Sequence, residues 1–268
     1  QLTLINRFTL EERKQLRQWG SPTTGHPEYD PFRGIENTSG PLGQGHTFAV
    51  GAAIAAKFLA ARTGNPTFAK ETIYAYISDG GIQEEISQGA ARVAGNLGLD
   101  NLIMFYDAND IQLSTETKVV MNENTSLKFQ AMGWEVFEID GNNVEEIRDA
   151  LKKAQAVKDK PTLIIGKCIM GKGALKADGT SYERSCKTHG APLGGDAYIN
   201  TIKNLGGDPE NPFVIWDEVQ EMYAKRLEEL KDLVAPRHAE ESAWAAANPE
   251  KAAAQKIWFS GEAPKIDW

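Results

Sequence analysis

Short apolar segments alternate with helical patterns through the middle of this chain, and this alternation restricts the fold more than any other feature. Apolar, β-branched and aromatic residues form candidate strands at 72–78, 102–107, 134–139 and 162–169. Patterns typical of helices separate these strands, at about 82–97, 125–132 and 143–157. Strands that alternate with crossover helices form a parallel sheet with helices on both faces. We therefore predict an α/β fold with a parallel β-sheet covered on both faces.

The regions on either side of this core have a different character. Thr9 is expected to cap a first helix, and small apolar residues at 47–62 predict a buried one. Near the C-terminus, apolar residues recur at helical spacing until Pro236, which is expected to end the helix. We divide the chain into an α/β domain, residues 1–206, and a helical extension with the start of an interdomain linker, residues 207–268.

The charge and cysteine content exclude several classes of protein. The 268 residues carry a formal net charge of −8, whereas non-specific binding to nucleic acid or anionic membranes needs a basic surface. Cys168 and Cys186 match neither a CxxC nor a zinc pattern, so reduced thiols are expected. The chain has no apolar run that could span a bilayer and no signal-peptide pattern at its start. We predict a cytoplasmic protein.

Two candidate strands end in residues that carry oxygen ligands. The strand YAYIS runs into Asp79 and Gly80, and the strand LIMFY is followed closely by Asn109 and Ile111. Ligands of parallel α/β sheets bind at the carboxyl ends of the strands. A carboxylate, an amide oxygen and the Ile111 carbonyl would give Mg²⁺ three ligands and leave the others to a diphosphate and water. We expect this Asp79 site to be solvent-accessible.

A plainer interpretation of the same residues remains open. An Asp-Gly pair after a strand is a common turn, and Asn109 could simply cap the next segment. Gly80 also fits the diphosphate site, because a residue without a side chain lets a phosphate approach the backbone amides at the start of the following helix. These residues alone do not decide between the turn and the diphosphate site.

Further motifs, in the same order and spacing, resemble those of one enzyme family. Asp79-Gly80 followed by Asn109 is similar to the magnesium and thiamine diphosphate motif of thiamine enzymes. The sequences GHPE at 25–28, GPLGQG at 40–45 and HGAPL at 189–193 narrow this resemblance. Together they resemble the cofactor-binding amino-terminal domain of transketolase, from about residue 10 to the end of the chain. The resemblance implies the thiamine-diphosphate-binding fold.

The resemblance also implies how the cofactor would be held. The magnesium ligands would be Asp79, Asn109 and the carbonyl of Ile111, and the Gly80 amide would reach the diphosphate. A rigid loop would place Gly40 and Leu42 against the aminopyrimidine and thiazolium rings. Thiamine diphosphate and Mg²⁺ are therefore the expected cofactors.

Two histidines and one glutamate match functional positions of the family. His26 would line the substrate channel, and His189 would lie between diphosphate and substrate, where an imidazole can relay a proton. Glu84 matches a carboxylate of a network across the subunit interface, although a solvated acid at a helix start is an equal alternative. His46 and His238 match no functional position and are taken as structural.

The chain departs from the family pattern at several positions. Ser78 and Glu85 stand where glycine is usual, and Gly89 stands where a second interface carboxylate is often found. The loop 174–188 is longer than the family pattern predicts. These differences concern two parts of the resemblance: the network of interface carboxylates and the alignment of this loop.

The resemblance implies the transfer of a two-carbon ketol unit between sugar phosphates, by a homodimer. The family's upstream Asn-Gly-His segment and its pyrimidine-binding domain, which carries the cofactor-activating glutamate, do not occur in this sequence. We therefore expect half of an active site, inactive in isolation and completed by a pyrimidine-binding domain from the same gene or a separate subunit. The alternatives are dihydroxyacetone synthase, deoxyxylulose-phosphate synthase and a non-catalytic module that binds a cofactor or partner. The three narrowing motifs favour transketolase.

Overall fold

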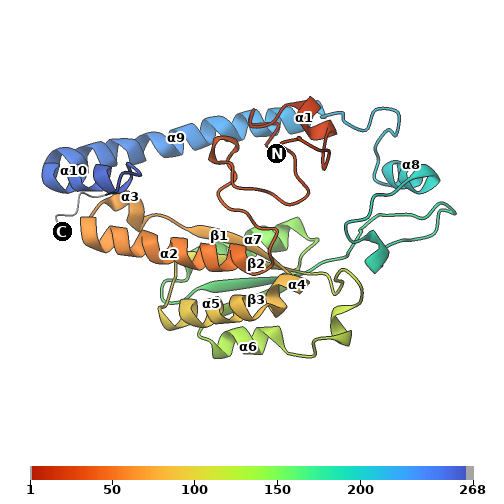
Figure 1. Cartoon of the computed structure of the whole chain (residues 1–268), viewed down its shortest axis with the longest axis horizontal. Coiled ribbons are helices and arrows are strands. Elements are labelled where there is room, and N and C mark those ends of the chain that lie inside the picture. The colour runs from red at the N-terminus through yellow and green to blue at the C-terminus, as the bar shows by residue number, and fades with distance from the viewer. Residues whose placement is uncertain (1, 264–268) are drawn as a thin grey trace. The chain divides into compact units, whose positions relative to one another are not determined.

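Four parallel strands form the centre of the fold in the computed structural model, which describes residues 2–263 (Figure 1). The strands are β1 (Ile73–Ser78), β2 (Leu102–Ala108), β3 (Glu135–Asp140) and β4 (Thr162–Lys167). Their order in the sheet is β1-β2-β4-β3, and all three neighbouring pairs are parallel. The predicted parallel α/β architecture is therefore confirmed. Because Ser78 pairs with Asp107, the carboxyl ends of β1 and β2 are level with each other.

Helices and short 3-10 turns lie before, between and after these strands. The helices are α1 (Leu10–Lys14), α2 (Gln44–Thr63), α4 (Asp79–Gln83), α5 (Glu85–Asn96), α6 (Thr125–Ala131), α7 (Val144–Ala156) and α8 (Gly195–Asn204). Three short 3-10 helices are η1 (Pro31–Arg33), η2 (Thr117–Val119) and η3 (Cys186–Thr188). Thr9 caps α1 through a reciprocal bond with Glu12, as predicted.

The predicted helix at 82–97 is wrong in one respect, because the structure has two helices there. Glu84 lies between α4 and α5 with an extended backbone, at ψ 131°. α4 begins at Asp79, closer to the strand than predicted, because the Ser78 hydroxyl accepts a hydrogen bond from the Gly81 amide and caps it. The chain therefore turns into a helix directly at the end of β1.

Each face of the sheet has its own packing. On one face, Ala150 and Ala154 of α7 form a core cluster with Ile103 and Ile164. The residues that alternate with these point to the opposite face. There, Trp134 donates a hydrogen bond to the backbone of α5, at Ala91 O, over 2.8 Å, and its ring meets Phe129 of α6 edge-on.

Strand β1 is less buried than its sequence predicts. Tyr76 is 81% exposed, and Tyr74 is also exposed. β1 lies at the edge of the sheet, and α7 packs mainly on β3 and β4. α7 reaches the face that carries the two tyrosines through the Gln155 side chain, which donates a hydrogen bond to the Tyr74 hydroxyl at 2.7 Å. The helical cover is therefore thinnest at this edge of the sheet.

The chain divides into two compact units that differ from the predicted domains. One contains Gln1–Gly51 and Thr72–Trp216, and the other contains Ala52–Glu71 and Asp217–Trp268. The whole sheet belongs to the first unit, and α2 contributes residues to both. The boundary predicted at residues 206 and 207 stays a prediction.

The second unit is helical. It contains α3 (Pro66–Ala69), α9 (Asp217–Ala247) and α10 (Pro249–Trp258). The rings of Phe68 and Phe259 stack at 6.1 Å within this unit. The prediction that Pro236 ends a helix is wrong, since α9 continues through it. A proline lacks its own N–H group, which removes one backbone hydrogen bond while the turns on either side keep theirs. Among the described residues, no helix is long and apolar enough to cross a membrane.

Candidate functional site

Asp79 occupies the junction between β1 and α4. It is 1% exposed, so the expected solvent-accessible position is wrong. The capping hydroxyl of Ser78, at 3.1 Å from the Gly81 nitrogen, fixes the chain direction at this junction. This bond gives the serine a structural role at a position where the transketolase pattern has glycine.

The Asp79 carboxylate is held by two donors from β2 and the turn after it. The Tyr106 hydroxyl donates to Oδ1 at 2.7 Å, and the Asn109 amide nitrogen donates to Oδ2 at 3.1 Å. Burial raises the pKa of Asp79, while these two bonds act in the opposite direction. Burial and the neighbouring carboxylate also raise the pKa of Tyr106 well above its ordinary value. A buried carboxylate that keeps free lone pairs is stabilised by a bound cation.

The turn after β2 brings the other two predicted ligands beside Asp79. Asn109, only 8% exposed, accepts a hydrogen bond at Oδ1 from the Ile111 amide at 3.1 Å. Its Nδ2 group donates to Asp107 at 3.3 Å. Between them, Asp110 has a left-handed backbone with φ 65°, which reverses the chain. The structure therefore brings Asp79, Asn109 and Ile111 into one hydrogen-bonded corner.

The ligand types at this corner fit a hard cation. One carboxylate, one amide oxygen and one backbone carbonyl are the oxygen donors that Mg²⁺ uses when a phosphate supplies the others. Among residues 2–263, the structure has no group of three or more His, Cys, Asp or Glu side chains placed to hold a metal ion. The corner thus resembles a site shared with a ligand more than a closed protein cage.

The predicted ring-binding residues lie next to the same corner. A Cβ atom on Gly80 would lie 3.2 Å from Leu42 Cδ1, and one on Gly40 would lie 3.1 Å from His26 Cβ. The loop that contains Gly40 and Leu42 therefore approaches both the start of α4 and His26. Leu42 is 52% exposed, and His26 is exposed as well. This edge of the site is open.

His189 follows η3 on a different loop. Its Nδ1 atom is buried and has no hydrogen-bond partner among the described residues. The Arg17 guanidinium donates to the carbonyl of the next residue, Gly190, at 3.3 Å, which links this loop to the amino-terminal segment. A buried ring nitrogen without a partner is suited to a ligand that is not part of the chain.

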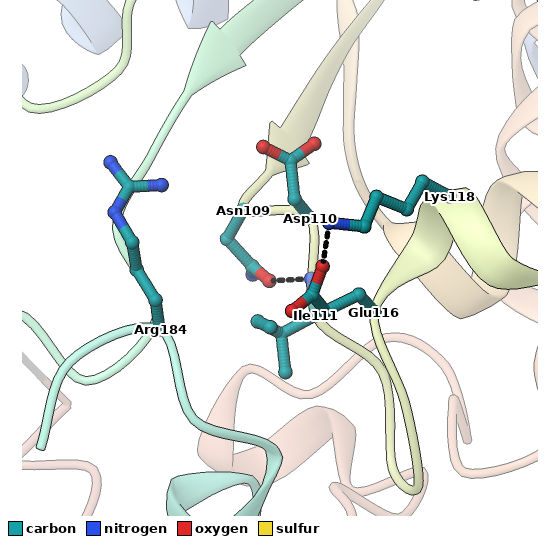
Figure 2. A pocket seen from close by; sticks show the side chains of 6 residues that line it. All are labelled: Asn109, Asp110, Ile111, Glu116, Lys118 and Arg184. Atoms are coloured by element: carbon teal, nitrogen blue, oxygen red, sulfur yellow. Dashed lines mark hydrogen bonds and ion pairs between the residues drawn. The ribbon is translucent and has the colours of Figure 1, made fainter.

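A pocket of about 350 Å³ opens beside the corner (Figure 2). It is lined by Asn109, Asp110, Ile111, Glu116, Lys118 and Arg184. An ion pair of 2.5 Å joins the Glu116 and Lys118 side chains. Motifs did not identify Tyr106 or Arg184 as site residues. The extra length of the loop 174–188 was the one signal that could have directed attention to Arg184.

Two further residues have mainly structural contacts. His46 is buried between Ser87, at 2.7 Å from Nδ1, and the Tyr76 carbonyl, at 3.3 Å from Nε2, and burial lowers its pKa. Glu84 is half-buried at the break between α4 and α5. Its expected place in an interface network stays a prediction.

Comparison with known proteins points to one family. Residues 2–264 match the family described as "Transketolase, thiamine diphosphate binding domain". A transketolase of Staphylococcus aureus (strain MRSA252) is 39% identical over 98% of this chain and 40% of its own length. The transketolase structure from Leishmania mexicana is 34% identical with a TM-score of 0.88, and covers 96% of this chain and 38% of its own.

A second solved structure is similar in the same way. It is a transketolase of Pichia stipitis in complex with sedoheptulose-7-phosphate, 32% identical with a TM-score of 0.83, over 92% of this chain and 36% of that one. In each comparison this chain spans well under half of the relative's length.

Proposed function

Because the chain belongs to the family of transketolase thiamine diphosphate binding domains, we propose that it holds the magnesium and diphosphate end of that cofactor. The reaction served is the transfer of a two-carbon ketol unit between sugar phosphates. The observation that carries this proposal is the buried corner at the ends of β1 and β2. There, the Asp79 carboxylate accepts hydrogen bonds from Tyr106 and Asn109, and the amide of Ile111, a proposed ligand, donates to Asn109.

Each oxygen donor of the corner has a defined role in the proposal. Asp79, the Asn109 amide and the Ile111 carbonyl would bind Mg²⁺, which would bridge to the diphosphate. Gly80 supports this arrangement because even a Cβ atom there would crowd Leu42 at 3.2 Å. A side chain at this position would narrow the space where the diphosphate approaches the first amides of α4.

The open edge would face the rings and the substrate. Gly40 and Leu42 would lie against the cofactor rings, and His26 would line the channel through which the sugar enters. His189 would donate or accept a proton at a sugar hydroxyl, which agrees with its buried Nδ1 atom, for which the described residues offer no hydrogen-bond partner. When bound, thiamine diphosphate supplies the carbanion chemistry, while the protein supplies binding, orientation and proton transfer.

A relative supports the proposed substrate class, and the family resemblance supports the proposed partners. The related Pichia stipitis transketolase binds sedoheptulose-7-phosphate, so sugar phosphates are the proposed substrate class. We propose that a pyrimidine-binding domain completes the site and that the active form is a homodimer with Glu84 near its interface. The isolated chain would then bind the cofactor weakly and turn over no substrate, because the cofactor-activating glutamate belongs to that other domain.

The test combines binding with reconstitution. The chain is titrated with thiamine diphosphate by calorimetry, with Mg²⁺ and then with EDTA, and ketol transfer is assayed before and after the remaining parts of a transketolase are added. We expect weak magnesium-dependent binding and activity only after recombination. Binding that ignores Mg²⁺, or substantial turnover by the chain alone, would overturn the proposal.

A further inference from the structure

Two strained residues meet in the pocket beside the corner formed by Asp79, Asn109 and Ile111, where we propose the metal site. Four non-glycine residues in the described part of the chain have a left-handed backbone: Asn6, Arg17, Asp110 and Arg184. Of these, Asp110 (φ 65°) and Arg184 (φ 56°) both line this pocket, and Figure 2 shows the Arg184 side chain across it from Asn109 and Asp110. Such backbone strain is uncommon outside glycine and concentrates at functional sites.

Hydrogen bonds of the long loop hold Arg184 in this conformation. Its amide donates to the Met170 carbonyl at 2.9 Å, just after β4. The neighbouring residue Glu183 accepts a bond from the Gly173 amide at 2.8 Å through its side chain. The loop returns upon itself at these bonds and delivers Arg184 to the end of the sheet where Asn109 lies. The extra residues of this loop therefore do more than span a distance, since they place a cation at the rim of the site.

The Arg184 guanidinium has no hydrogen bond or ion pair among the residues that the structure describes, and the residue is exposed. Its acidic neighbours form no ion pair with it. Glu116 is paired with Lys118, and the Asp110 side chain forms no ion pair with Arg184. The planar guanidinium group is suited to bidentate phosphate binding. At Arg184 the strained backbone holds this group beside the proposed diphosphate, and no residue between 2 and 263 pairs with it.

We propose that Arg184 is a phosphate-binding residue of this site, which adds a second positive charge beside the metal ion. This inference rests on the proposed function. The expected ligand is the diphosphate of the cofactor, because Asn109 and Ile111 line the same pocket. The phosphate group of the sugar substrate could form the same contact with Arg184, and the experiment distinguishes the two ligands.

The experiment measures binding by calorimetry at several salt concentrations. The chain is titrated with magnesium pyrophosphate, thiamine diphosphate and sedoheptulose-7-phosphate. Arg184→Gln is compared with Lys176→Gln, an exposed cation of the same loop that does not line the pocket. We expect Arg184→Gln to weaken pyrophosphate and thiamine diphosphate binding about tenfold and to flatten the salt dependence, as for the loss of one charged hydrogen bond. Lys176→Gln should leave binding unchanged, and Arg184→Lys should keep part of the affinity.

The outcomes separate this inference from the proposed function. Weakened binding of the sugar phosphate alone would still support Arg184 as a phosphate ligand and assign the contact to the substrate. Suppose that the wild-type chain binds magnesium pyrophosphate and that Arg184→Gln binds each of the three ligands as tightly as the wild type does. The inference is then overturned, while the proposed function stands. If Asp79→Ala also binds like the wild type, the metal site itself is wrong. Circular dichroism of each variant checks that it is folded.

Discussion

The corner at Asp79, where we propose the metal site, and the edge formed by Leu42, His26 and His189, which we propose to face the cofactor rings, differ in how completely the chain organises them. In the corner, Asp79 is buried, and both of its carboxylate oxygens accept hydrogen bonds from residues of β2 or the turn that follows. At the edge, Leu42 and His26 are exposed, and the Nδ1 atom of His189 lacks a partner among the described residues. The first region is complete in its own contacts, and the second is not.

This difference indicates what each region requires from outside the chain. Hydrogen bonds formed during folding position the corner before any ligand binds, so little ordering cost remains for a metal ion. The edge must gain its order from the cofactor and from the domain that we propose to complete the site. A thiamine diphosphate bound only through its diphosphate would therefore be held in place at one end.

The largest effect is expected for Asp79→Ala, which removes the centre of the corner. We expect a loss of magnesium-dependent thiamine diphosphate binding. Stability should also fall, because the buried donors Tyr106 and Asn109 N–H lose their acceptor, at about 1–3 kcal/mol for each unsatisfied group. Calorimetry and urea denaturation measure the two effects. Glu85→Ala, at an exposed carboxylate nearby, is the control, and equal behaviour of both variants would contradict the metal assignment.

The edge should respond differently. In the recombined enzyme, His189→Ala is expected to lower kcat by about 10² to 10⁴-fold, as for the loss of a general acid–base group, with little change in cofactor affinity. Steady-state kinetics and cofactor titration separate these quantities. His238→Ala, an exposed histidine of α9, should behave like the wild type. A His189→Ala enzyme with normal kcat would return this histidine to a structural role.

A smaller effect is expected for Tyr106→Phe, which keeps the ring and removes the donor to Asp79 Oδ1. Residues that orient a metal ligand typically change metal affinity by about 10–100-fold, and we expect Mg²⁺ binding to weaken toward the lower end of this range. The free energy of unfolding should fall by about 1 kcal/mol. Tyr76→Phe, on the exposed edge strand, is the matched control. Identical Mg²⁺ titrations of the two variants would show that the corner does not depend on this bond.

The smallest effect concerns pH. Burial raises the pKa of Asp79 above its ordinary value of 3.8. At pH values between these two pKa values, the folded chain keeps a proton on Asp79 that the unfolded chain has lost. In the metal-free protein, this group therefore lowers stability as the pH rises from about 3.8 to the raised pKa. The free energy of unfolding of the wild type should fall across that window relative to that of Asp79→Asn. Mg²⁺ should reduce this fall, because it binds the deprotonated carboxylate. Parallel pH curves for the two proteins would refute this.

The sequence by itself determined the alternation of strands and helices along the chain, the cap at Thr9 and the presence of oxygen-bearing side chains at the ends of β1 and β2. These features depend on local patterns, because the periodicity of apolar residues and the chemistry of caps act over a few neighbouring positions. The family motifs added the roles of Asp79 and Asn109 by resemblance. They did not identify the contacts that hold those residues.

The tertiary structure decided the features that depend on distant partners. The register that pairs Ser78 with Asp107 brings Asp79 to Tyr106, which lies on the next strand, and no local pattern contains that alignment. The exposure of Tyr76 follows from the position of β1 at the edge of the sheet. Arg184 reaches the pocket only because backbone bonds fold its loop back toward β4. In each case the deciding energy lies in hydrogen bonds and packing between segments far apart in the chain, which local sequence preferences do not encode.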